Sequence, residues 1–111
     1  GFTRSLFGRI RPLSEISTTN GRGNDALRRI ALNTPIQSTA ADIAKLAMIA
    51  YSKACGCRPL VLQVHDSLVC ECPSSDLEEA SKTLRDSMEK AVTLSVPLTV
   101  EVKYGDSFAA L

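Results

Sequence analysis

Two β-rich runs separated by a very short connection constrain the fold of this chain more than any other sequence feature. The first run covers residues 60–65 (LVLQVH), the second covers residues 68–72 (LVCEC), and only Asp66 and Ser67 lie between them. Two residues are the length of a tight hairpin turn, so we expect the runs to pair antiparallel. His65 and Asp66 should then lie at the tip of the hairpin, held rigidly by an apolar strand on each side.

Helical segments are predicted before and after this hairpin. Residues 25–33 favour a short helix that ends at Thr34, because the residue before a proline avoids the α-helical region. Pro35 suits the first turn of a new helix, which the Ala-rich sequence extends to about Ala54. A third helix should begin near residue 75, where the sequence SDLE has the spacing of a capping box.

Other segments have the spacing typical of strands and turns. Residues 2–6 and 9–13 are expected to form a short hairpin, followed by a loop over residues 17–24 that is rich in Ser, Thr, Asn and Gly. Residues 96–104 alternate between apolar and polar side chains, which predicts a last strand. We therefore expect an α+β fold in which a small antiparallel sheet of about three strands is backed by helices.

The positive charge of the chain is concentrated in its first third. Residues 1–33 contain six arginines and two acidic residues, for a net charge of +4, whereas the whole chain of 111 residues carries +1. The planar guanidinium group pairs well with phosphate oxygens, so this segment is compatible with a nucleic-acid partner. A basic surface that faces only solvent is the alternative, and charge alone does not decide between the two.

Composition and motifs exclude several classes of function. The apolar run at residues 40–51 is interrupted by charges and is shorter than the ~20 residues of a membrane span, so no membrane-spanning helix is predicted. Phosphate-binding glycine motifs are absent, and a single histidine, His65, gives no support for a Ser-His-Asp triad. The four cysteines form two C-x-C pairs and are expected to be reduced thiols in an intracellular protein, with a four-cysteine zinc site as the alternative.

Three polar side chains are spaced four residues apart across Pro35. They are Arg29, Asn33 and Gln37, which a nearly continuous helical path would align on one face. Such a strip could contact a nucleic-acid groove or backbone, but solvent-facing residues at helix ends would have the same spacing. Asp66 has a comparable alternative, since an aspartate in a turn commonly bonds its own backbone.

Four segments in the same order resemble the C-terminal part of the family A DNA polymerases, the DNA polymerase I type. The most distinctive are residues 33–43 (NTPIQSTAADI) and residues 62–69 (LQVHDSLV). Residues 5–13 (SLFGRIRPL) resemble the segment that follows the fingers helix in that family, and residues 96–102 (VPLTVEV) resemble its last palm strand. The resemblance implies an incomplete polymerase domain, in which residues 1–33 adjoin the fingers and residues 34–111 belong to the palm.

The resemblance also implies roles for individual residues. Asp66 matches the motif C aspartate, which in the family binds two catalytic Mg²⁺ ions together with an aspartate of motif A. His65 matches a histidine placed near the primer terminus, and Arg29, Asn33 and Gln37 match residues that contact primer-template DNA near its minor groove. Catalytic roles are therefore implied for Asp66 and His65, metal binding for Asp66, and DNA binding for His65 and the three-residue strip.

The chain departs from the family pattern in two respects. The family usually has a glutamate where this chain has Ser67, and neither the motif A aspartate nor the fingers helix that binds the incoming dNTP has a counterpart here. The resemblance implies that the rest of the polymerase chain supplies both, and that the parent protein copies primer-template DNA in the cytoplasm of a bacterial or phage-infected cell. The chain alone is expected to be inactive. A non-catalytic nucleic-acid-binding module, or a split-polymerase subunit that needs a partner chain, is the alternative.

Overall fold

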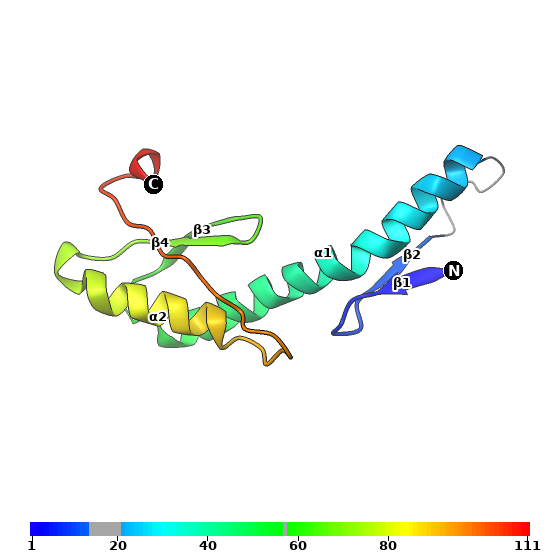
Figure 1. The fold of residues 1–111 in the computed structure, drawn as a ribbon. Coiled ribbons are helices and arrows are strands. Elements are labelled where there is room, and N and C mark those ends of the chain that lie inside the picture. Colours follow the sequence, from blue (N-terminus) through cyan, green and yellow to red (C-terminus); the bar gives the residue numbers. More distant parts are fainter. Residues whose placement is uncertain (14–20, 57) are drawn as a thin grey trace. The chain divides into compact units, whose positions relative to one another are not determined.

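The computed structural model describes residues 1–13, 21–56 and 58–111. In these residues two antiparallel sheets of two strands each are combined with two α-helices and two short 3₁₀ helices (Figure 1). This combination confirms the expected α+β fold class. The chain divides into two compact units, Gly1–Asp42 and Ile43–Leu111, and each is built around a part of the long helix α1 (Gly21–Ala54).

The first unit opens with the hairpin expected near the N-terminus. Strand β1 (Phe2–Arg4) pairs antiparallel with β2 (Ile10–Pro12), with Thr3 opposite Arg11. The connection is closed by backbone hydrogen bonds, including one of 2.8 Å from the Ser5 amide to the Arg9 carbonyl. Gly8 has a φ of 92°, a left-handed conformation in which a residue without a Cβ is favoured.

Helix α1 differs from the two helices expected on either side of Pro35. It runs without interruption for 34 residues, with Pro35 inside it, and it includes residues 21–24, which were expected to be a loop. Residues 17–20 of that expected loop lie outside the described part. A proline inside a helix leaves the carbonyl four residues earlier without its usual donor. Here the Thr3 hydroxyl donates to that carbonyl, on Ala31, over 3.3 Å, so a contact from β1 supports the helix where the sequence predicted its end.

The second unit contains the hairpin expected from the two β-rich runs. Strand β3 (Leu60–Val64) pairs antiparallel with β4 (Ser67–Cys70), and a β-bulge between Leu60 and Leu62 shifts the register at the base. The third expected helix is confirmed as α2 (Leu77–Glu89). The expected capping box is not formed. A short 3₁₀ helix, η1 (Ser74–Asp76), precedes α2 instead, and the N-cap residue of α2, Asp76, makes no side-chain hydrogen bond to the helix.

The strand expected over residues 96–104 is not formed. This segment runs alongside α2 (orange in Figure 1) as extended chain, and the described residues that follow form only the 3₁₀ helix η2 (Phe108–Ala110). The Val100 amide donates to a side-chain oxygen of Glu89 on α2 over 3.1 Å, so it is not available to a neighbouring strand. Residues 96–104 therefore do not add a strand to β3 and β4. The sheet that these two form has two strands instead of about three.

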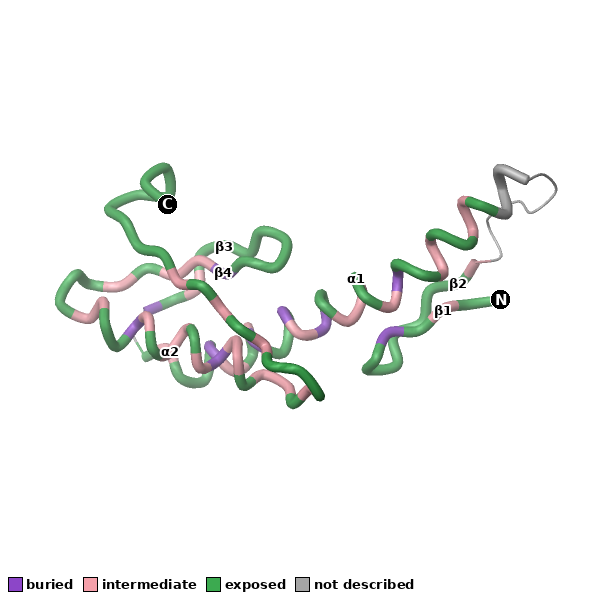
Figure 2. The backbone as a smooth tube through the Cα atoms, in the orientation of Figure 1, coloured by how far each residue is buried: buried purple, intermediate pink, exposed green. Residues whose placement is uncertain are grey.

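The core of the second unit is small and is centred on the C-terminal part of α1. Ala44, Ala47 and Tyr51 are buried there, at positions that share one face of the helix, and Leu68 and Ala80 complete the buried apolar set. In Figure 2 buried residues are purple, and they form only short sections of a tube that is mostly half-buried or exposed. Within the described ranges, no helix is long and apolar enough to cross a membrane.

Candidate functional site

The β3–β4 turn places His65 and Asp66 next to each other at an exposed tip. Val64 lies opposite Ser67 in the hairpin register, so the turn consists of these two residues alone. Both side chains are exposed, and Ser67 is the first residue of β4. The expected position of His65 and Asp66 at the tip of the hairpin is thus confirmed.

The backbone of His65 has an uncommon conformation. Its φ is 54°, in the left-handed region, which costs a residue with a Cβ roughly 1–2 kcal/mol. The flanking strand pair enforces it, and the Gln63 side-chain amide donates to the His65 carbonyl over 3.4 Å. Strained residues of this kind gather at functional sites. The sequence contained the signal for it, because two-residue hairpin turns require a positive φ at one or both central positions.

Asp66 brings a hard oxygen ligand to the tip, the type that Mg²⁺ prefers. A metal centre needs more ligands than this one carboxylate, and the described residues contain no group of three or more His, Cys, Asp or Glu side chains arranged to hold an ion. Cys55, Cys70 and Cys72 are free thiols, and Cys57 lies outside the described part.

The strip formed by Arg29, Asn33 and Gln37 lies on the first unit. All three residues are exposed on α1, and at ~100° per residue they fall within an arc of about 80°. The helix residues that the β1–β2 hairpin contacts lie on the opposite side, and two of them, Thr34 and Asp42, are buried. The continuous helix therefore aligns the three side chains as expected and leaves their face open.

A second group on α1 was not identified from the sequence. The Asp42 carboxylate accepts a hydrogen bond of 2.8 Å from the Ser5 hydroxyl and forms an ion pair of 2.7 Å with Arg9. The Asp42 side chain is 10% exposed and that of Arg9 is 49% exposed, so the pair is partly shielded from solvent. These partners are more than 30 residues apart in the chain, and no local pattern links them. Their contacts fix the hairpin to the helix.

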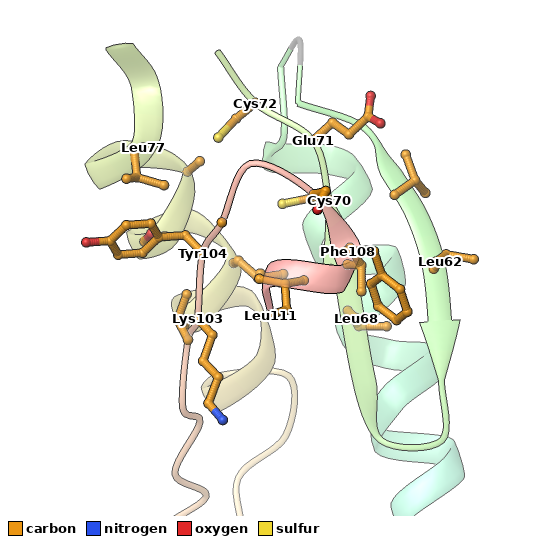
Figure 3. Close-up of a pocket in the computed structure, with 18 of the residues that line it drawn as sticks. Leu62, Leu68, Cys70, Glu71, Cys72, Leu77, Lys103, Tyr104, Phe108 and Leu111 are labelled. Atoms are coloured by element: carbon orange, nitrogen blue, oxygen red, sulfur yellow. The ribbon is translucent and has the colours of Figure 1, made fainter. Parts of the chain in front are cut away.

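A groove of 580 Å³ lies within the second unit, away from the tip. Figure 3 shows Cys70 and Cys72 on one wall, Leu77 of α2 on another, and Tyr104 and Phe108 from the C-terminal segment. Its lining is mainly apolar and includes neither His65 nor Asp66. The groove therefore belongs to the packing between the hairpin and α2, and it is not the candidate catalytic site.

Tyr51 holds the base of the β3–β4 hairpin. It is fully buried on α1, and its hydroxyl donates to the Arg58 carbonyl over 2.6 Å. Burial, reinforced by contact with Cys70, raises the pKa of the tyrosine hydroxyl above its ordinary value. The Arg58 guanidinium approaches Glu79 on α2 at 3.6 Å. Through Arg58, these contacts connect α1, the residues that lead into β3, and α2 at the base of the hairpin.

Comparison with known proteins identifies the family. The sequence profile of DNA polymerase family A matches residues 1–110. The chain belongs to this family. The resemblance seen in the sequence is thereby confirmed over nearly the whole chain.

Individual family members are similar over the same extent. DNA polymerase I of Treponema pallidum (strain Nichols) is 44% identical over 97% of the chain, and that of Mycobacterium bovis is 42% identical over 99%. The solved structure of the POL domain of Pol1 from M. smegmatis, in complex with DNA primer-template and dNTP, superimposes with a TM-score of 0.90 at 40% identity and covers 99% of the chain. The chain spans 11% and 13% of the two relatives and 20% of the solved chain.

Proposed function

We propose that the parent protein is a template-directed DNA polymerase and that this chain supplies part of its palm and of the adjoining fingers. The observation that carries the proposal is the TM-score of 0.90 to a polymerase domain bound to DNA primer-template and dNTP, over 99% of the chain. The family match over residues 1–110 supports the same conclusion. In this proposal residues 1–33 adjoin the fingers and residues 34–111 belong to the palm.

Asp66 is the proposed metal ligand and His65 its catalytic neighbour near the primer terminus. The short turn fixes the backbone of Asp66 relative to the two strands, so the carboxylate is presented from a defined position at the tip. Two Mg²⁺ ions, when bound, would activate the primer 3′-hydroxyl and stabilise the leaving pyrophosphate. The second aspartate of this site and the dNTP pocket come from the rest of the polymerase chain. With one carboxylate of the pair, the isolated chain does not polymerise.

Arg29, Asn33 and Gln37 are the proposed contacts to primer-template DNA, together with His65. Their common exposed face on α1 supports this role, since guanidinium and amide groups donate to the acceptors of the minor groove. Those acceptors occur in every base pair, so the strip can test the geometry of a base pair without reading its sequence.

Primer extension tests the proposal directly. The full-length parent protein is compared with its Asp66→Asn variant, which keeps the size of the side chain but removes its charge, using Mg²⁺, dNTPs and a labelled primer-template. We expect DNA binding to be retained and extension to collapse. Asp76→Asn, a matched change at the N-cap of α2, is expected to extend normally. Full extension by Asp66→Asn would remove Asp66 from the catalytic site.

One observation favours a second candidate, a non-catalytic nucleic-acid-binding protein or a split-polymerase subunit. Ser67 follows Asp66 where the family usually has a glutamate, so the tip offers one carboxylate instead of two. A parent that binds primer-template DNA but does not extend it would favour the binding protein. Extension that appears only when this chain is mixed with upstream polymerase segments would favour the subunit.

A further inference from the structure

Pro35 leaves a gap in the hydrogen bonding of α1, and a residue from another element fills it. In a helix without proline the amide of residue 35 would donate to the carbonyl of residue 31. Pro35 has no amide hydrogen, so the Ala31 carbonyl lacks this donor. The Thr3 hydroxyl on β1 donates to this carbonyl instead, over 3.3 Å. The acceptor that Pro35 leaves vacant is thus satisfied from the hairpin.

Further contacts attach the same hairpin to α1 on both sides of Pro35. Before the proline, the Arg11 guanidinium donates to the Thr34 hydroxyl over 3.2 Å. After it, the Leu6 amide donates to the Thr39 hydroxyl over 2.9 Å. One turn further on, Asp42 accepts the Ser5 hydroxyl at 2.8 Å and pairs with Arg9 at 2.7 Å. The hairpin therefore bridges the position at which a helix would otherwise bend.

A bend at this position would fall in the middle of the polar strip. Sharp helix kinks occur mainly at proline, where the missing hydrogen bond and the ring both weaken the turn. Asn33 lies before Pro35 and Gln37 after it, on the side of α1 opposite the hairpin contacts. Because a kink changes the direction of the helix axis, it would turn these two side chains out of a common line.

We propose that the β1–β2 hairpin acts as a splint that limits bending of α1 at Pro35, and that Thr3 is a positioning residue for the DNA-contacting strip. The inference rests on the proposed function, in which the strip contacts primer-template DNA. Thr3 acts through the helix backbone and does not touch the DNA. Its importance depends on Pro35, because an amide at residue 35 would make the threonine hydroxyl unnecessary.

A double-mutant cycle between Thr3 and Pro35 tests this dependence in the parent protein. Thr3→Val keeps the shape of the side chain without the hydroxyl, Thr3→Ser keeps the hydroxyl, and Pro35→Ala restores the amide donor to Ala31. Each variant and the double variant are assayed for equilibrium binding of a labelled primer-template, with thermal unfolding recorded in parallel. We expect Thr3→Val to weaken binding about three- to tenfold, the effect of one lost hydrogen bond, and Thr3→Ser to bind like the native protein.

The decisive comparison is made in the Pro35→Ala background. There Thr3→Val should change the affinity less than twofold, because the amide of residue 35 now satisfies Ala31. An equal loss of affinity in both backgrounds, or no loss in a folded Thr3→Val protein, would overturn the proposal. A merely structural role would lower the unfolding temperature and leave the affinity of the folded protein unchanged.

A second variant keeps the proposal testable if Thr3→Val does not fold. Thr34→Val removes the acceptor for Arg11 while keeping every charge, and it should also weaken binding of primer-template DNA. Unchanged affinity would count against the splint. A native parent protein that binds no primer-template DNA would instead refute the proposed function, so the two failures are distinguishable.

Discussion

The hydroxyl of Tyr51 donates a hydrogen bond of 2.6 Å to the backbone carbonyl of Arg58, and so connects the last turns of α1 to the chain that enters β3. Tyr51 is fully buried and Arg58 is 8% exposed. A buried carbonyl without a hydrogen-bond donor destabilises the folded state, because it has lost its bonds to water and gains none in the protein. This bond therefore contributes to holding the β3–β4 hairpin on the helix.

Removing this hydroxyl should destabilise the protein. We expect Tyr51→Phe to lower the free energy of unfolding by roughly 1–3 kcal/mol, because the Arg58 carbonyl is left buried without its partner. Denaturant unfolding followed by circular dichroism measures the change. Tyr104→Phe is the matched control, since Tyr104 is 70% exposed, and its effect should be near zero. Equal effects of the two substitutions would contradict this role of the Tyr51 hydroxyl.

The same tyrosine predicts a loss of stability at alkaline pH. Its pKa is raised in the folded protein above the value of about 10 expected in the unfolded chain, mainly by burial. The folded state then holds a proton that the unfolded state releases, so the stabilisation is complete below pH 10 and is lost as the pH rises beyond it. The slope contributed by Tyr51 should reach at most roughly 1.4 kcal/mol per pH unit. Unfolding at several pH values, with Tyr51→Phe lacking this component, provides the measurement.

Ser67 should limit the metal affinity of the complete active site. We expect Ser67→Glu, which restores the carboxylate usual in the family, to lower the Mg²⁺ concentration needed for half-maximal primer extension by the parent protein. An added carboxylate next to Asp66 increases the negative charge that attracts the ion. Ser74→Glu adds the same charge at another exposed position and should leave the Mg²⁺ dependence unchanged. A Mg²⁺ requirement that does not change in Ser67→Glu would exclude this role.

Arg29 and Asn33 should affect DNA binding in distinguishable ways. We expect Arg29→Gln to weaken binding of primer-template DNA and to reduce the salt dependence of the affinity, because the guanidinium brings a positive charge into the minor groove between the phosphate backbones as well as a hydrogen-bond donor. Asn33→Ala should weaken binding by roughly 1 kcal/mol without changing the salt dependence, because it removes a hydrogen bond and no charge. Filter binding at several salt concentrations separates the two effects. Arg85→Gln, at an exposed position of α2, controls for the loss of a positive charge elsewhere.

The elements whose signals are local could be predicted from the sequence. The two-residue gap between apolar runs fixed the β3–β4 hairpin and the position of His65 and Asp66, since few other structures fit that spacing. The helix expected to begin near residue 75 is likewise found as α2, although the capping box that indicated its start is not formed. The spacing of Arg29, Asn33 and Gln37 required a continuous helix, and this condition is met.

The features that depend on distant contacts could not be predicted in this way. Pro35 indicated a helix end because its local effect is unfavourable, whereas the donor that offsets it, Thr3, lies 28 residues away from its acceptor. Residues 96–104 alternate like a strand, but a strand requires a neighbour, and the Val100 amide bonds to Glu89 instead. The contacts of Asp42 could not be predicted for the same reason, because its partners Ser5 and Arg9 are more than 30 residues away in the sequence.

The β-bulge at the base of β3 confines the irregular strand pairing to the end of the hairpin that lies away from the tip. The register from Leu62 to Val64 against β4 is regular, and the irregularity is confined to the residues between Leu60 and Leu62. The bulge takes up unequal numbers of residues on the two strands, because Leu60 and Leu62 lie opposite the consecutive residues Cys70 and Val69. The position of the Asp66 backbone relative to β4 is therefore set by the regular pairs nearest the turn, and not by the irregular pairing at the base of the hairpin.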